Sequence, residues 1–292
     1  EVVATALDAW GWEGLRKLDG MFAVAWTGGD GQLCLARDRF GEVPLHYADD
    51  CAASELKVLQ AMNFGRAPAA GYVPPGGIVP LAKGQPHRTG TFHANGQPTP
   101  SNHGFEAAAA AVRSALCRGV TDRPMADVPV FTLLSGGLDS TAVAWAAKQV
   151  MSGLVAYTAV HDVKSSDLRA ARLAADAIGC ELREVHVPAP TAADLDAVVK
   201  AIEMPYKAQV EIGWPCLVLA DRICADGFKV VFSGEGSDEL WGSYGFAYHG
   251  IAFASGRAYL CGDLAARRAH VANRNHELHS LCCGIALGRA HA

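Results

Sequence analysis

The segment from Val128 to Ser140, VPVFTLLSGGLDS, places the strongest constraint on the fold. An apolar run rich in β-forming residues ends in a turn with two adjacent glycines, and the apolar run TAVAWAAKQV then has helical character. A strand, a glycine loop and a helix in this order present backbone N–H groups and a helix N-terminus to phosphate. By itself, the pattern is equally typical of a glycine-rich turn without a ligand.

Strand and helix patterns alternate from Phe105 onward. The apolar strand segments cover 128–134, 154–160, 182–187 and 229–232. This alternation predicts a parallel sheet covered on both faces, whose ligands bind at the carboxyl ends of the strands. The loops expected at that edge are 135–140, 161–167 and 233–239.

Helix ends in this half are predicted from capping residues. We expect Asp167 to be the N-cap of a helix over 167–178 and Gly179 to be its C-terminal stop. A further helix is expected over 212–225.

The first hundred residues have a different pattern, with one helix followed by short strands. The segments 22–26 and 33–37 flank the glycine-rich turn TGGDG and predict a hairpin, and 52–62 has helical spacing. We therefore expect one domain with its linker over residues 1–102 and a second domain over 103–292.

The loop 135–140, called the first Ser-Gly loop below, lacks the lysine and the spacing of a Walker A motif. It is therefore not expected to serve transfer of a terminal phosphoryl group. Two glycines, two hydroxyls and a carboxylate suit a pyrophosphate leaving group instead. Ser135 and Ser140 would donate to its oxygens, and Asp139 would hold Mg²⁺.

The segment VVFSGEGSDEL repeats the arrangement of strand and Ser-Gly loop. Glu235, Asp238 and Glu239 place three carboxylates within five residues. Asp238 and Asp139 would bracket Mg²⁺, and Glu235 would face the reacting carboxyl group. The alternative is a solvated acidic turn.

Together, SGGLDS, SGEGSDELWGSY and ARDRFGEVPLHY resemble the asparagine synthetase family, whose relatives include β-lactam synthetases and lasso-peptide cyclases. The resemblance implies a parallel-sheet α/β ATP-pyrophosphatase domain of the adenine nucleotide α-hydrolase type. It also implies that a partial N-terminal-nucleophile-type α+β glutaminase-like domain precedes it.

The resemblance also implies roles for individual residues. The pyrophosphate would be bound by Ser135, Gly136, Gly137, Asp139 and Ser140. The rest of the nucleotide pocket would be formed by Leu133 and Val160, through their backbone at adenine, and by Ser233 and Gly234. Glu235 would be the catalytic residue at the acyl-adenylate, and Asp139 and Asp238 would be the magnesium ligands.

The implied reaction is ATP-dependent adenylation of a small-molecule or peptide carboxylate, with release of pyrophosphate. An amine or ammonia then attacks to form an amide. The sequence leaves two alternatives open: a glutamine-independent amide-forming or cyclising enzyme, and a non-catalytic nucleotide-binding homologue.

The chain departs from the family pattern in three places. No residue can be assigned to the N-terminal catalytic cysteine of the glutaminase, and Cys34 and Cys51 lie in apolar strand or turn contexts, so glutamine hydrolysis is not expected. No lysine follows Lys229, whereas the family has a late catalytic lysine; a complete chain would therefore adenylate poorly. The expected substrate region, 203–214, has no arginine for a free aspartate carboxylate, although Tyr206 and Trp214 would suit a bulkier substrate.

Composition narrows the partners. With a net charge of −5 and no basic run, the chain is not expected to bind nucleic acid, and no apolar run reaches the roughly 20 residues that span a bilayer. Nine scattered cysteines favour reduced thiols in a cytoplasmic protein. A homodimer is compatible with this pattern.

Overall fold

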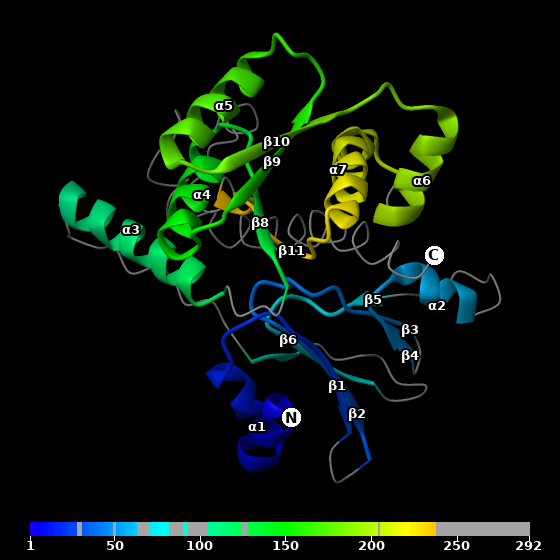
Figure 1. Cartoon of the computed structure of the whole chain (residues 1–292). Coiled ribbons are helices and arrows are strands. Elements are labelled where there is room, and N and C mark those ends of the chain that lie inside the picture. The colour runs from blue at the N-terminus through cyan, green and yellow to red at the C-terminus, as the bar shows by residue number, and fades with distance from the viewer. Residues whose placement is uncertain are drawn as a thin grey trace, which may run out of the picture. The chain divides into compact units, whose positions relative to one another are not determined.

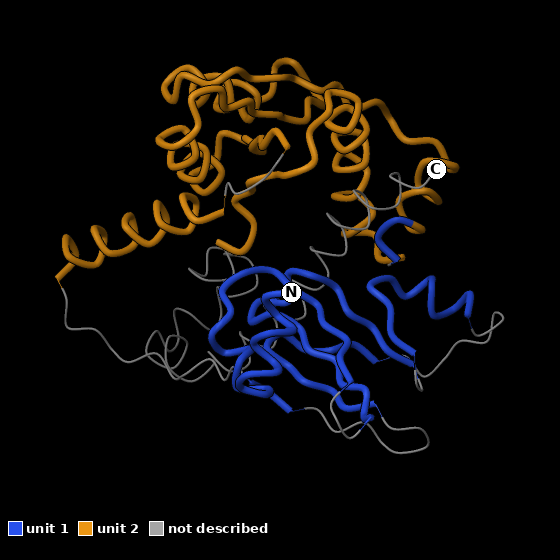
Figure 2. Tube along the Cα trace, turned by 60° about the horizontal axis from the view of Figure 1, so that its bottom comes forward, with its two compact units in different colours: residues 1–98, 201–203, 257–287 blue, residues 99–200, 204–256, 288–292 orange. Residues whose placement is uncertain are grey.

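The computed structural model describes most of the first 237 residues. The described ranges are 1–27, 31–48, 51–62, 71–81, 90–92, 104–123, 128–203 and 205–237. They divide into two compact units, shown in different colours in Figure 2. Among the described residues, the first unit contains those up to 92 together with 201–203, and the second contains the others.

The first unit contains a helical N-terminus and two small antiparallel sheets. Its helical elements are α1 (Val2–Trp10), the 3₁₀ helix η1 (Gly11–Lys17) and α2 (Leu56–Met62). Its strands are β1 (Ala23–Thr27), β2 (Leu33–Arg37), β3 (His46–Ala48), β4 (Cys51–Ala53), β5 (Gly71–Tyr72), β6 (Gly77–Leu81) and β7 (Gly90–Thr91). The sheet orders are β1-β2-β6-β7 and β4-β3-β5, and the expected hairpin is present as the pair β1–β2.

The two faces of the larger sheet pack against different layers. Leu35 and Val79 join Leu45 and Val73 in a core shared with the smaller sheet. On the other face, Ala36 packs with buried side chains of the helical N-terminus, among them Leu7. Alternate residues of β2 therefore serve opposite layers, as the period of a strand requires.

Two adjacent polar residues at the end of β2 organise the following turn. The buried Arg37 guanidinium donates to the carbonyl oxygens of Val43 at 2.6 Å and Val73 at 3.2 Å. The Asp38 carboxylate accepts backbone N–H groups of Phe40 and Glu42, both at 3.0 Å. These bonds satisfy the buried polar groups. The segment ARDRFGEVPLHY therefore has a structural role, in which Arg37 and Asp38 fix the backbone of the turn after β2.

The second unit alternates strands and helices around a parallel sheet (Figure 1). Its elements are α3 (Phe105–Thr121), β8 (Val130–Leu133), α4 (Leu138–Val150), β9 (Val155–Val160), α5 (Ser166–Ile178), β10 (Glu181–His186), α6 (Ala192–Ile202), α7 (Lys207–Ala225) and β11 (Val230–Phe232). The strand order is β10-β9-β8-β11, and every pair is parallel. The predicted α/β class and parallel sheet are confirmed.

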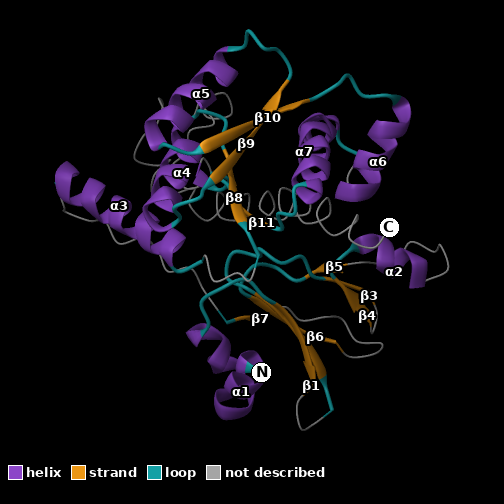
Figure 3. Cartoon of the chain, viewed as in Figure 1, coloured by secondary structure: helices purple, strands orange, loops and turns teal. Residues whose placement is uncertain are grey.

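Helices cover both faces of this sheet (Figure 3). Phe131, Val155 and Tyr157 point to the α7 side, where they pack with Leu219 and Ile223. The intervening residue Ala156 points to the opposite side and packs with Ala144 of α4 and Ala175 of α5. Small side chains on α4 and α5 allow both helices to approach the sheet closely.

Several predicted helix boundaries were wrong. The N-cap of α5 is Ser165, whose hydroxyl accepts the Leu168 N–H at 3.2 Å; Asp167 lies inside the helix. Gly179 does end this helix, in the left-handed conformation with φ 74°. The helix expected from residue 212 begins at Lys207, and the one expected from 52 begins at Leu56 because Cys51–Ala53 pairs as a strand.

None of the described helices has the length and hydropathy of a membrane-spanning segment.

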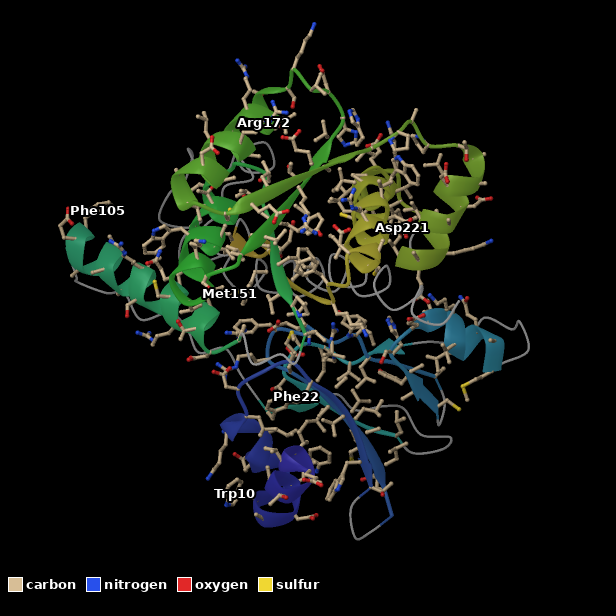
Figure 4. The ribbon with its side chains drawn as sticks, viewed as in Figure 1. Trp10, Phe22, Phe105, Met151, Arg172 and Asp221 are labelled. Atoms are coloured by element: carbon tan, nitrogen blue, oxygen red, sulfur yellow. The ribbon has the colours of Figure 1, made fainter. Side chains whose placement is uncertain are left out.

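A polar network lies near the amino ends of the parallel strands. The hydroxyl of the fully buried Tyr157 donates to Asp226 at 2.5 Å and accepts from Arg183 at 3.0 Å. Arg183 also bonds Asp226 at 2.9 Å, and Arg222 does so at 3.0 Å. Chiefly through the bond from Tyr157, the pKa of Asp226 is lowered to about 2. On the outer face, Arg172 of α5, labelled in Figure 4, pairs with Glu184 of β10.

Tyr157→Phe removes the hydroxyl that joins Asp226 to β9 and keeps the ring. We expect a loss of about 1.5–3 kcal/mol in the free energy of unfolding, since this bond is made to a charged group. Urea denaturation measures it. An unchanged midpoint would show that the hydroxyl contributes nothing to stability.

His46 makes stability depend on pH. Burial, and secondly the charge of Arg37, lower the pKa of His46 to about 4, against 6.5 in the unfolded chain. The neutral imidazole therefore stabilises the fold fully above pH 6.5, and this contribution is lost between pH 6.5 and 4, by at most about 3 kcal/mol. His46→Gln should flatten the decline of unfolding free energy over this interval, as measured by urea titrations at pH 7, 5.5 and 4. Parallel pH curves for the two proteins would contradict the assignment.

Candidate active site

The two Ser-Gly loops meet where the strand order reverses. From β8 the chain proceeds outward to β9 and β10, and β11 then returns to the other side of β8. Such a switch point is where open parallel sheets bind ligands. The strands are joined there by Thr132, a fully buried residue whose hydroxyl donates to the Phe232 carbonyl at 3.2 Å. In the sequence, the only sign of a special role for Thr132 is its place in an otherwise apolar strand.

The first loop is closed by its own hydroxyls. Ser135 Oγ and Ser140 Oγ are 3.0 Å apart, and Ser135 Oγ accepts the Gly137 N–H at 3.3 Å. Ser140 Oγ also accepts the Ser135 N–H at 3.3 Å. Both hydroxyls predicted to contact pyrophosphate therefore lie side by side at the start of α4.

The two glycines of the loop have different constraints. Gly136 has φ +80°, and a Cβ there would lie 2.4 Å from the Ala170 carbonyl carbon and the Ala171 nitrogen, both backbone atoms of α5. At Gly137, a Cβ would meet only the Ser135 hydroxyl, at 3.4 Å. Gly136 is thus required by packing, whereas the space beside Gly137 is open to a ligand.

The N-terminus of α4 has no side-chain cap. Gly137 occupies the N-cap position, and no side chain bonds the first N–H groups of the helix. In contrast, α5 is capped by Ser165. Uncapped N–H groups and the helix dipole favour an anion at the start of α4.

The second Ser-Gly loop, which follows β11, packs directly on the N-terminus of α4. A Cβ at Gly234 would lie 2.8 Å from the Ser140 nitrogen and 3.0 Å from the Asp139 carbonyl carbon. Ser233 Oγ accepts the Glu235 N–H at 3.4 Å, which is the same turn geometry as that of Ser135 with Gly137. The two loops are therefore similar locally and touch through glycine.

One hydrogen bond joins the side chains of the two Ser-Gly loops. Ser237 Oγ donates to Asp139 Oδ1 at 2.9 Å. Ser237 was not singled out from the sequence, although it lies within SGEGSDE. Asp238, the second predicted magnesium ligand, lies outside the described residues, as does Glu239. No group of three or more His, Cys, Asp or Glu side chains with metal-binding geometry occurs in the described part of the chain.

Glu235 is exposed, and its carboxylate acts electrostatically on Cys216 of α7. Partial burial, and secondly the Glu235 carboxylate, raise the pKa of the Cys216 thiol to about 11. This cysteine of α7 is therefore protonated at neutral pH and is a poor nucleophile. The effect of Glu235 on this thiol shows that the Glu235 carboxylate lies within electrostatic range of the middle of α7.

The residues predicted to contact adenine occupy neighbouring strand ends. Leu133 is the last residue of β8, and Val160 is the last residue of β9. The Val160 carbonyl accepts the Val187 N–H at 3.0 Å, which leaves one lone pair for a ligand.

The expected substrate region largely forms the first turns of α7. The Trp214 indole donates to the Pro188 carbonyl at 2.8 Å, so it ties α7 to the segment after β10. Tyr206 is 64% exposed at the N-cap, and Lys207 pairs with Glu211 at 3.6 Å. Of the two aromatic residues, Tyr206 is the one available to a ligand.

These features define an α/β domain with a four-stranded parallel sheet and two Ser-Gly loops at its switch point. Comparison with known families identifies the chain further: asparagine synthase matches residues 111–290, and the glutamine amidotransferase domain matches residues 1–69. The chain belongs to the asparagine synthase family and carries an N-terminal glutamine amidotransferase domain.

Curated relatives include asparagine synthetases of plants. "Asparagine synthetase [glutamine-hydrolyzing] 3" of Arabidopsis thaliana is 32% identical over 265 residues, covering 84% of this chain and 44% of the relative. "Asparagine synthetase [glutamine-hydrolyzing] 2" of Oryza sativa subsp. japonica is 31% identical over 268 residues, covering 84% of this chain and 43% of the relative. The chain thus spans less than half the length of these two relatives. Among solved structures, the ammonia-dependent NAD synthetase of Campylobacter jejuni matches with a TM-score of 0.36 at 16% identity, over 60% of this chain and 90% of that one.

Replacing each loop glycine by alanine should separate packing from binding. Gly136→Ala should destabilise the fold by more than about 2 kcal/mol, because a left-handed residue is strained and its Cβ meets the backbone of α5. Gly137→Ala should fold normally and bind ATP on the order of tenfold more weakly, since backbone approach to the phosphates is hindered. Urea denaturation and calorimetry measure the two effects. Equal stability of the Gly136→Ala variant, or unchanged ATP affinity of the Gly137→Ala variant, would contradict this division.

Proposed function

We propose that the protein forms an amide bond from a carboxylate and an amine or ammonia, through an acyl-adenylate, with release of AMP and pyrophosphate. The observation that carries the proposal is the pairing of an uncapped α4 N-terminus with a second Ser-Gly loop at the switch point. Family membership supports ATP as the nucleotide, because the asparagine synthase family uses ATP.

The site chemistry favours cleavage between the α- and β-phosphates. The loop after β8 has no lysine to reach a terminal phosphate, but it has Ser135, Ser140 and the open N–H groups of α4. These donors stabilise negative charge that develops on departing pyrophosphate. Glu235, on the neighbouring loop, is assigned to the reacting carboxyl group and the incoming amine.

Magnesium suits the donor set at the junction of the loops. The Asp139 carboxylate and nearby hydroxyl oxygens are hard ligands of the kind that Mg²⁺ prefers. When bound, the ion would neutralise charge on the phosphates. Asp139 is assigned to hold it, together with Asp238.

The nitrogen donor is proposed to be ammonia or an amine. In the described part of the first unit, Cys34 is buried in β2, and Cys51 lies in β4 opposite Ala48. Neither position presents an exposed catalytic thiol, so no glutaminase role is assigned to these two cysteines. Glutamate release from glutamine by the intact protein tests this part separately.

Product analysis tests the proposed reaction. The intact protein with ATP, Mg²⁺ and a panel of L-aspartate, other amino acids and short peptides should yield AMP and pyrophosphate in equal amounts, only with an accepted carboxylate. Asp139→Asn should lower this rate by about 100-fold or more, comparable to loss of an electrostatic contact in a transition state. Chromatography of labelled nucleotide measures both.

The matched control is Asp176→Asn, since Asp176 is exposed on α5; it should retain wild-type rates. ADP and phosphate as products would contradict adenylate chemistry. Tight MgATP binding without turnover for any carboxylate would instead indicate a non-catalytic nucleotide-binding protein.

A further inference from the structure

We propose that Ser237 is a positioning residue, which orients the Asp139 carboxylate toward the cation that accompanies ATP. This inference rests on the proposed nucleotide site and adds a role that the sequence did not assign. The two residues are separated by 98 positions, and their side chains meet at 2.9 Å. The bond between Ser237 and Asp139 therefore forms only when the second Ser-Gly loop packs against the first.

The hydrogen bond selects one oxygen of the carboxylate. Ser237 donates to Oδ1, and among the described residues this is the sole hydrogen bond that Asp139 accepts through its side chain. A carboxylate with one oxygen held by a hydroxyl has a restricted rotation and keeps its second oxygen for a ligand. Hydrogen bonds of this kind orient metal-binding carboxylates and affect metal affinity.

Backbone packing keeps the donor in place. Gly234 lies against the Asp139 backbone so closely that a Cβ would stand 3.0 Å from the Asp139 carbonyl carbon. The Ser237 N–H donates to the Gly234 carbonyl at 3.4 Å, which closes the turn between them. Because Gly236 has φ +90°, the chain reverses sharply and returns the serine hydroxyl to Asp139.

The alternative is a purely structural bond that holds the loops together. A structural bond would affect thermal stability and nucleotide affinity at every metal concentration. A positioning role predicts a specific change in metal dependence. The two roles are therefore separable by measuring nucleotide binding at different Mg²⁺ concentrations.

The experiment uses the intact protein, with a non-hydrolysable α,β-methylene analogue of ATP as probe. Calorimetry across a Mg²⁺ series gives the metal concentration for half-maximal enhancement of binding. Ser237→Ala should raise this concentration about tenfold and leave affinity for the metal-free analogue unchanged. Ser237→Thr keeps the hydroxyl and should restore the wild-type value.

A matched control removes a different hydroxyl–carboxylate bond. Thr191 Oγ1 donates to Asp194 at 2.7 Å at the start of α6, outside both loops. Thr191→Val should lower the melting temperature and leave the Mg²⁺ dependence unchanged. That result would show that a loss of stability alone does not change the Mg²⁺ concentration needed for analogue binding.

A double-mutant cycle supplies the second measurement. In an Asp139→Asn background, adding Ser237→Ala should cause no further change in Mg²⁺ dependence, because the two residues act through one carboxylate. Additive effects, or a wild-type Mg²⁺ dependence in Ser237→Ala, would overturn the positioning role while the nucleotide site stands. Absence of analogue binding by the wild-type protein would overturn both the role and the proposed function.

Discussion

The contact between Gly234 and the N-terminus of α4 is the constraint on which the candidate site depends. Only glycine fits at position 234, since a Cβ there would stand 2.8 Å from the Ser140 nitrogen. This close approach brings the loop after β11 onto the loop after β8 and puts Ser237 within reach of Asp139. One parallel pairing, β8 with β11, aligns the two loops at the same edge of the sheet.

A hydrogen-bonded polar network stabilises the opposite edge of the parallel sheet. Tyr157, Arg183 and Asp226 bond to one another near the amino ends of the strands, away from the loops. Their charges are paired, whereas the α4 N-terminus at the opposite edge keeps its N–H groups uncapped. Polar groups are thus satisfied where the sheet needs stability and left available where a ligand is proposed to bind.

Much of the fold could be predicted because local patterns specify it. Alternating apolar strands and helices predicted the parallel sheet, and Gly179 predicted the end of α5. Errors arose where neighbouring signals compete: Ser165 and Asp167 are both good N-caps, and backbone geometry selects the serine. The helix expected over 52–62 lacks its first residues, because Cys51–Ala53 pairs with β3 and tertiary pairing outweighs weak propensity in a short segment.

Residue type and order are enough to establish the family, the two Ser-Gly loops and the absence of a Walker lysine from the loop 135–140. The three-dimensional structure distinguishes Gly136, which packs against the backbone of α5, from Gly137, which has open space beside it, because adjacent glycines differ only in their surroundings. It also decided that Ser237 bonds Asp139 across 98 positions of chain. Contacts between distant segments depend on strand order and register, which no local pattern encodes.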